Sequence, residues 1–412
     1  MQRYMQSFTL NRIKPKTTVI IILALGLYSL PGRAGEVITR ERFVSLALQE
    51  NLDSKVAAAR VSSARATAGS FLLPAPMVGF TQMRVQDDVA AGFEVSQSLP
   101  FPSRISHDRS ARQIEVDARI AAQRSSEREV DAQARLLYFQ IWQRQERVSL
   151  LQEKKRAVEQ HIKLATAGAR SDSFQKIHVI KAESELDLLE NEVLQATQEA
   201  REIQIEAARF VNLDTLVFKP VATEMPLTTL PRELDLVTPL QLEVPKLELA
   251  VLRAREREAN SARFPDLNLR YRETDGTKMS PRTSELMIGI TLPFLFFWEA
   301  DSVSERATSD RFIAELRLQQ EQKNFAAERA LLLSRAYAFQ KQLEQIRERL
   351  LPRAEKRLRL VHNLAPRDLE ILQDHRETME LIPDLKLKAL EIRGQYEAVV
   401  ADLKKYESRS EK

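Results

Sequence analysis

Two long stretches of this sequence contain neither glycine nor proline, the residues that most often end or bend a helix. The first runs from Arg104 to Ala167 and the second from Ala169 to Lys219, so that only Gly168 separates them. At 1.5 Å per residue, a helix of about 60 residues would be roughly 90 Å long, far beyond an ordinary globular helix. The sequence therefore predicts a long helical hairpin with its tip near Gly168.

The second stretch carries apolar side chains at alternating spacings of three and four residues. They are Val179, Ala182, Leu186, Leu189, Val193, Ala196, Ala200, Ile203, Ala207 and Phe210. This heptad pattern is typical of a helix that packs along its length against other helices, and its alanines allow close approach. The composition agrees, since a chain of 412 residues with only 10 glycines favours long helices.

The whole plan occurs twice along the chain, which indicates an internal duplication. A helix from about Thr39 to Ser70 precedes two short alternating segments and the first hairpin. A helix from about Pro239 to Arg263 precedes two further segments, a long helix from about Glu299 to Asn363 and a last helix. The predicted organisation is a signal peptide at 1–34, a first repeat at 35–219, a linker at 220–238 and a second repeat at 239–412.

Two prolines, Pro352 and Pro383, lie inside the predicted helices of the second repeat. A proline removes a backbone hydrogen bond and clashes with the preceding turn, so we expect bends or breaks there.

The first 34 residues have the layout of a secretory signal peptide. Basic residues precede an apolar run from Thr17 to Leu30, and small residues lead up to Ala34. The run of about 14 residues is shorter than the ~20 that span a bilayer, although an uncleaved membrane anchor is the alternative. Without this segment the 62 basic residues fall by five to 57, against 58 acidic ones. The basic charge thus belongs to the export signal and does not indicate nucleic-acid binding.

The chain has no cysteine, which excludes disulfides, thiolate metal sites and a lipid anchor on cysteine. No later apolar segment reaches the length of a transmembrane helix. If the exported protein lies in a membrane, strands must place it there.

Four short segments alternate between apolar and polar residues, at about 77–86, 92–99, 266–273 and 284–292. In the third, Leu267, Leu269 and Tyr271 alternate with Arg270 and Arg272. Nine or ten residues is the length of a tilted strand that crosses a bilayer, but two hairpins on a soluble core fit the alternation equally well. Four strands are too few to close a barrel, so the membrane interpretation requires several copies of the chain.

Taken in this order, the segments resemble the TolC-like outer membrane efflux proteins, the outer membrane subunits of tripartite efflux pumps. The resemblance rests on the duplicated helix-strand-strand-long helix-helix plan, on the strand that ends in "SQSLPFPSR" before a long helix, and on the Gly168 tip. It covers nearly all of the chain after the signal segment.

The resemblance implies a mainly α fold with a small β part, in the outer membrane of a Gram-negative bacterium. Each chain of a homotrimer would give four strands to one 12-stranded transmembrane β-barrel, and its helices to a long periplasmic helical barrel. The helical tips would dock onto a periplasmic adaptor (membrane fusion) protein, which connects to an inner membrane pump of the proton-driven efflux type. The duct itself would be passive.

The resemblance also implies that acidic side chains after the second tip narrow the periplasmic aperture. The matching residues are Asp368, Glu370 and Asp374, of which Glu370 and Asp374 lie one helical turn apart on one face. Rings of carboxylates around a threefold axis would repel one another and favour cations. An acidic residue in a first helical turn and solvated neighbours explain the same residues equally well.

Two further groups of residues are candidates by position. The adaptor-contacting tips comprise Ala167, Gly168, Ala169, Arg170 and Ser171 together with Leu364, Ala365 and Pro366. Ordinary turn chemistry also accounts for a glycine or proline at these places. The aromatic cluster Phe294, Phe296, Phe297 and Trp298 lies where the last strand would leave the bilayer, and it suits either a membrane-interface anchor or core packing at the base of the barrel.

The sequence offers no enzyme constellation. Its five histidines are scattered without metal-ligand spacing, and it has no phosphate-binding glycine loop and no nucleophile motif. We therefore expect no catalytic residue, no metal, no cofactor and no nucleic-acid partner. The expected function is a passive exit duct for efflux or secretion, and the rival is a soluble periplasmic coiled-coil scaffold or adaptor without a pore.

Overall fold

The computed structural model describes residues 38–70, 73–85, 88–168, 173–213, 225–231, 240–261, 263–276, 281–291, 297–362 and 369–406. The segment expected to be a signal peptide, 1–34, lies outside these residues.

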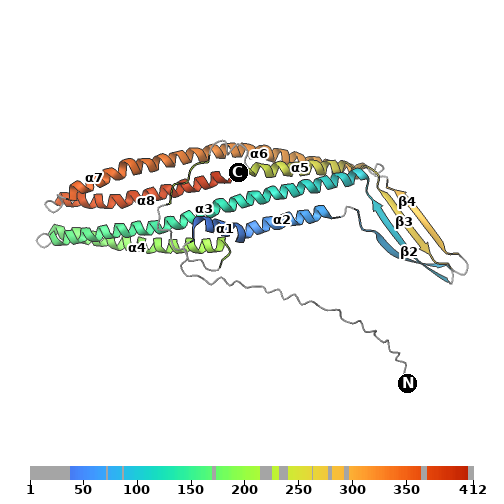
Figure 1. Ribbon diagram of the computed structural model, residues 1–412, viewed down its shortest axis with the longest axis horizontal. Helices are drawn as coiled ribbons and strands as arrows, with labels where there is room; N and C mark the ends of the chain where they lie inside the picture. Colours follow the sequence, from blue (N-terminus) through green and yellow to red (C-terminus); the bar gives the residue numbers. More distant parts are fainter. Residues whose placement is uncertain are drawn as a thin grey trace, which may run out of the picture.

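The molecule is elongated, with four strands at one end and two helical hairpins that extend to the other (Figure 1). The first half comprises α1 (Arg40–Glu50), α2 (Leu52–Gly69), β1 (Met77–Val85), β2 (Asp88–Leu99), α3 (Pro102–Gly168) and α4 (Ser173–Phe210). The second half comprises α5 (Leu240–Ser261), β3 (Leu267–Thr274), β4 (Thr283–Ile290), α6 (Phe297–Gln345), a π-helical turn (Ile346–Leu350), α7 (Leu351–His362) and α8 (Leu369–Lys405). The predicted fold class, a duplicated and mainly α chain with a small β part, is confirmed.

The long helix α3 has 67 residues, which corresponds to about 100 Å. Helix α4 packs against it along the predicted heptad seam. All ten seam residues are buried or half-buried, and Ala182, Ala196 and Ala207 are almost wholly enclosed. The spacing of apolar residues in the sequence therefore identified the packed face of α4 correctly.

The helix expected from Thr39 to Ser70 is in fact two helices, α1 and α2, separated at Asn51. The Asn51 side-chain oxygen accepts a hydrogen bond from the backbone N–H of Asp53 (2.9 Å), and its amide group donates to the carbonyl of Phe210 (3.0 Å). Asn51 thus caps α2, and it connects the break between α1 and α2 to the last residue of α4.

The two prolines of the second repeat behave differently. Pro352 is the second residue of α7, the helix that directly follows the π-helical turn, so the expected irregularity occurs beside it. Pro383 lies inside α8, which is helical from Leu369 to Lys405, so of the expected bend or break a break does not occur, and a bend stays a prediction. Pro383 and its neighbour Ile382 are buried, and their packing holds the segment helical despite the missing backbone bond.

The four strands form one antiparallel sheet in the order β1-β2-β3-β4. The central pair, β2 with β3, joins the hairpins of the two halves, with Val95 opposite Tyr271 and Glu94 opposite Arg272. Alternation then gives the sheet one apolar face, made of Val78, Phe80, Phe93, Val95, Leu267, Leu269, Tyr271, Leu286, Ile288 and Ile290. Among the described strands, nothing pairs with the outer edge of β1 or of β4.

The apolar face of the sheet is open to the surroundings of the chain. Phe80 is 90% exposed and Leu286 is 70% exposed. No helix of the described ranges packs along this sheet, so the apolar core of the molecule lies among the helices. Two hairpins folded onto a soluble core, the alternative left open by the sequence, do not describe this arrangement. None of the helices that the structure describes combines the length and apolar character needed to cross a bilayer.

Candidate functional site

The polar face of the sheet carries a charged cluster at the junction of the two halves. The carboxylate of Glu94 on β2 lies 2.8 Å from Nε of Arg270 and 2.9 Å from Nη2 of Arg272, both on β3. Arg272 is directly opposite Glu94 in the strand register, and Arg270 is its diagonal neighbour. The Glu94 side chain is 14% exposed while the arginines are 45% and 39% exposed. The two guanidinium groups therefore cover the carboxylate and present positive charge to solvent.

Small residues surround this cluster on the same face. At Gly92, a Cβ atom would lie 2.4 Å from the carbonyl oxygen of Glu273, so the close approach of β2 to β3 requires glycine there. Glu285 on β4 lies opposite Arg272 and adds a second acidic group to the face. A sheet with paired charges on one face and apolar side chains on the other is typical of strands that separate water from lipid.

The residues predicted to form the acidic aperture are only partly located. Asp368 lies outside the described residues, and Glu370 belongs to the first turn of α8, one turn before Asp374. Asp374 is half-buried and forms an ion pair with Arg357 of α7. This partner in a neighbouring helix was not anticipated from the sequence.

Further ion pairs connect α8 to the first hairpin near the same end. Arg376 lies 3.4 Å from Glu185 of α4 and 3.3 Å from Glu380, its neighbour one turn along α8. Burial of the Glu380 carboxyl raises its pKa, and nearby Glu185 adds to the rise while Arg376 opposes it.

Two lysine-carboxylate pairs continue this connection between α3 and α8. Lys154 lies 2.7 Å from Asp384, and Lys386 lies 2.7 Å from Glu153. Together with Arg376, they tie the helical hairpin of one repeat to that of the other.

The predicted tip and anchor residues are only partly among the described residues. Ala167 and Gly168 are the last two residues of α3, whereas Ala169, Arg170, Ser171, Leu364, Ala365 and Pro366 lie outside the described residues. Phe297 and Trp298 begin α6, and Trp298 is 60% exposed. The rest of the aromatic cluster, Phe294 and Phe296, lies outside the described residues. Their roles at the adaptor and at the membrane interface stay predictions.

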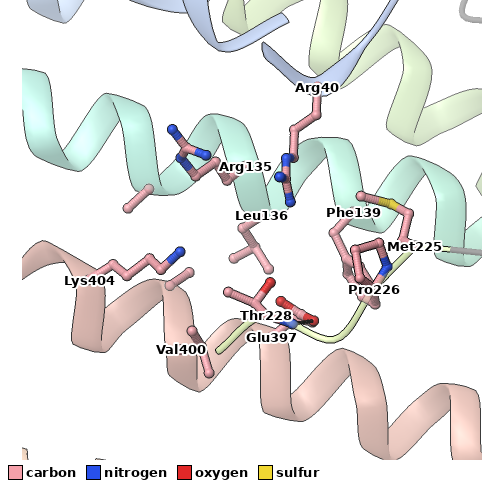
Figure 2. Close-up of a pocket in the computed structure, with 12 residues that line it drawn as sticks. Arg40, Arg135, Leu136, Phe139, Met225, Pro226, Thr228, Glu397, Val400 and Lys404 are labelled. Atoms are coloured by element: carbon pink, nitrogen blue, oxygen red, sulfur yellow. Dashed lines mark hydrogen bonds between the residues drawn. The ribbon is translucent and has the colours of Figure 1, made fainter. Parts of the chain in front are cut away.

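A segment of the linker, residues 225–231, passes between α3 and α8 and closes a small pocket (Figure 2). The Tyr396 hydroxyl donates to the carbonyl of Thr228 (2.8 Å), and the Thr228 N–H donates to the Glu397 carboxylate (3.0 Å). The Arg393 guanidinium lies 4.6 Å from the Trp142 ring centre and donates to the carbonyl of Met225. The cavity of about 30 Å³ has room for a water molecule and not for an organic ligand.

Sequence reasoning missed this anchoring site and the Glu94 cluster. The position of Tyr396 in the last helix does not indicate which loop its hydroxyl would bind. Arg270 and Arg272 were recognised as polar residues of an alternating segment, and only the pairing of β2 with β3 brings them to Glu94. Within the part of the chain that the structure describes, no three histidine or carboxylate side chains converge as a metal site.

No protein-family model and no curated protein matches this sequence. Solved structures do match. The MtrE outer membrane channel of Neisseria gonorrhoeae, in its open state, has a TM-score of 0.77 at 15% identity over 90% of this chain and 88% of that chain. The CmeC outer membrane channel of Campylobacter jejuni has a TM-score of 0.71 at 15% identity over 98% of this chain and 96% of that one.

A third match is CusC, studied for the changes that accompany folding and transmembrane channel formation. It has a TM-score of 0.75 at 14% identity over 90% of this chain and 92% of that one. At these identities the comparison concerns the fold. The chain has the fold of the outer membrane channels, over nearly its whole length, as the resemblance in its sequence implied.

Proposed function

We propose that this protein is a passive outer membrane channel, the exit duct through which an efflux or secretion system releases its substrates. The observation that carries the proposal is the two-faced sheet at one end of the long helices. One face exposes large apolar side chains, and the other carries the covered carboxylate of Glu94 with Arg270 and Arg272. The fold shared with MtrE, CmeC and CusC supports it.

The sheet needs further copies of the chain to become a channel. Its outer strands β1 and β4 leave backbone groups that a neighbouring sheet would pair, and a closed barrel has no such edges. Three copies would supply 12 strands, with the apolar face toward lipid and the Glu94 face toward a water-filled lumen.

The helices would continue this lumen through the periplasm. Helix α3 alone extends for about 100 Å, which allows its end at Gly168 to meet a periplasmic adaptor far from the outer membrane. We propose that the adaptor binds around this tip and the second one, that it connects the duct to a proton-driven inner membrane pump, and that Asp368, Glu370 and Asp374 line the aperture between the tips. Trp298 and its aromatic neighbours would anchor the chain at the periplasmic interface of the outer membrane.

The rival function, a soluble periplasmic scaffold, accounts poorly for the sheet. Phe80, Leu286 and Ile288 would remain in water as part of a contiguous apolar surface, which soluble monomers rarely expose.

One pair of neighbouring residues on β4 separates the two functions. Ile288 lies on the apolar face and Met287 on the polar face of the same strand. A lysine at position 288 would face lipid and cost about 2–4 kcal/mol near the bilayer centre, whereas a lysine at 287 would face water. We therefore expect Ile288→Lys to reduce outer membrane insertion strongly and Met287→Lys to insert normally.

The measurements are membrane fractionation, heat-modifiable mobility of the oligomer and conductance in planar bilayers. The proposal is wrong if the wild-type protein is recovered only from the soluble periplasm, or if the two lysine variants insert equally well.

A further inference from the structure

Two histidines occupy packed positions in the long helices, at the end far from the sheet. His161 of α3 is 5% exposed, and His375 of α8 is 2% exposed. His161 lies three residues after Val158 and four before Ala165, which are both buried. His375 lies three residues before Thr378, which is wholly enclosed. Each imidazole thus takes a place in the helical packing that an apolar side chain normally fills.

Ion pairs between α3 and α8 show that the two histidines lie at nearly the same height. Lys154 of α3 pairs with Asp384 of α8, and Glu153, one residue earlier, pairs with Lys386, so the two helices run antiparallel. Counting seven residues onward from Lys154 and seven back from Asp384 places residue 161 level with about residue 377. His375 lies about two residues from that level, or about 3 Å.

Helix α4 reaches the same height and adds a carboxylate. Arg376, next to His375, lies 3.4 Å from Glu185 of α4 and 3.3 Å from Glu380. The side chains of Arg376 and Glu380 are 15% and 24% exposed. A polar layer therefore crosses α3, α4 and α8, and we call it the histidine layer; its members are His161, Glu185, His375, Arg376 and Glu380.

Four acidic groups in and beside the histidine layer already have basic partners. The pairs are Asp374 with Arg357 of α7, Asp384 with Lys154, and Glu185 and Glu380 with the shared Arg376. Burial raises the pKa of Glu380, so this carboxyl is the first of the four to become neutral on acidification. The three remaining acidic groups then balance the three basic ones. A proton on either imidazole would add a positive charge that none of these neighbours balances.

Burial and this charge balance both favour neutral imidazoles while α8 is packed on α3 and α4. A charged group in a low-dielectric interior is strongly disfavoured unless it is paired. If α8 separates from α3, the imidazoles reach water, where a histidine takes up its proton at about pH 6.5. Below that pH the separated arrangement binds more protons than the packed one, so acidification favours separation. At pH 5.5 the effect is up to about tenfold for each histidine.

We propose that His161 and His375 make the packing of α8 on α3 and α4 sensitive to pH, firm at neutral pH and loosened on acidification. The inference goes beyond the proposed channel function and does not depend on it, because the histidine layer lies within one chain. It gives the helical end of the molecule a response to the acidity of its surroundings.

Hydrogen exchange of the assembled protein in detergent measures the loosening. Exchange of the α8 segment 373–384, corrected for the intrinsic effect of pH, should show at least about tenfold more opening at pH 5.5 than at pH 7.5. The double variant His161→Leu/His375→Leu keeps neutral side chains in the packing, so its opening should differ less than about twofold between the two pH values. His107→Leu, at a half-buried position of α3 far from this layer, is the control and should respond like the wild type.

A second double variant, His161→Gln/His375→Gln, decides the test if the leucines prevent folding. It has no group that titrates near pH 6.5 at these positions and should also lose the response. Equal opening of the wild-type protein at both pH values overturns the proposal, and so does a tenfold response that survives in the folded histidine variants.

A distance measurement shows which helices separate. Thr166 of α3 and Gln373 of α8 are exposed and lie at nearly the same height, and the natural chain has no cysteine. Spin labels on Thr166→Cys/Gln373→Cys, in assemblies diluted with unlabelled chains, report the distance within one chain. It should lengthen and broaden at pH 5.5, and it should stay constant when both histidines are leucine. A wild-type distance that is the same at both pH values contradicts the loosening.

Glu380→Gln separates the histidines from the neighbouring carboxyl. Glutamine resembles the protonated form of Glu380, so this variant should still loosen at pH 5.5. Loss of the response in Glu380→Gln together with its retention in the histidine variants would assign the pH dependence to Glu380 and overturn the proposal. None of these measurements uses conductance, so their failure leaves the exit duct standing, and a protein that loosens without conducting retains the histidine layer.

Discussion

Arg272 of β3 donates through both Nε and Nη2 to one carboxylate oxygen of Glu94 on β2, at 3.2 and 2.9 Å. This contact lies where the first repeat of the chain meets the second within the sheet. The other carboxylate oxygen of Glu94 is taken by Arg270. One carboxylate thus binds two guanidinium groups on the face that we assign to the lumen, and the three side chains together keep a net positive charge.

Replacing Glu94 should change the ion preference of the channel. In Glu94→Gln the two guanidinium groups lose their counter-charge, so we expect the reversal potential in a KCl gradient to shift toward anion selectivity. Glu273→Gln removes the same charge from the opposite face of the sheet and serves as the control. An unchanged reversal potential in Glu94→Gln would place this cluster outside the ion path.

The same replacement should weaken the sheet only modestly. The arginines reach solvent, which screens the interaction, and the carboxylate is a partly buried acceptor, so the loss should be about 1 kcal/mol. Thermal unfolding of the assembled protein in detergent measures it.

Asn51→Ala should destabilise the helical part. The substitution removes the cap of α2 and leaves the Phe210 carbonyl without the Asn51 amide, at a cost of about 1–2 kcal/mol. The matched control is Asn191→Ala on the exposed surface of α4, which should unfold like the wild type. Chemical denaturation followed by helical circular dichroism compares the two, and equal midpoints would contradict the capping role.

Tyr396→Phe should loosen the linker without disturbing the helices. Burial raises the pKa of the Tyr396 hydroxyl to about 12, so this group stays a hydrogen-bond donor to Thr228 throughout the physiological range. Its loss should cost about 1 kcal/mol and speed proteolysis within residues 225–231. Tyr337→Phe, at an exposed position of α6, should leave the cleavage rate unchanged.

Glu380 should make the helical bundle less stable as the pH rises. Its pKa is above the ordinary 4.5 in the folded protein because burial disfavours the charged form. From about pH 4.5 up to the folded pKa, the folded state therefore binds more protons than the unfolded state, and the free energy of unfolding falls with increasing pH.

Melting temperatures across pH 4 to 8 test this dependence. Glu380→Gln should be more stable than the wild type at neutral pH and should lose this part of the slope, whereas Glu377→Gln on the exposed side of α8 should keep it. A parallel pH profile for Glu380→Gln and the wild type would show that this carboxyl does not control the stability.

The sequence predicted the elements of this fold well because apolar residues recur at regular spacings in its long helices and in its strands. The heptad spacing from Val179 to Phe210 identified the packed face of α4. The break at Asn51 escaped detection since its cause is a contact with Phe210, distant in the sequence. At Pro383 the local rule predicted a bend or a break, and the helix continues without a break because its neighbours pack around this residue.

The candidate site was less predictable, because its chemistry depends on which elements are neighbours. Asp374 was expected as an aperture carboxylate on the strength of its place after the second tip. That its charge is balanced by Arg357 follows from the packing of α7 on α8, which spacing within α8 does not reveal.

The two arginines at alternate positions of β3 also favour the correct register of β3 against β2. A slip of β3 by one residue against β2 would turn Arg270 and Arg272 toward the face that we assign to lipid, and Leu269 and Tyr271 toward the face that we assign to the lumen. Each misplaced charge would cost about 2–4 kcal/mol inside a bilayer. A sheet with this misaligned register would therefore insert poorly into the membrane. Membrane insertion would then select the correct alignment of the strands.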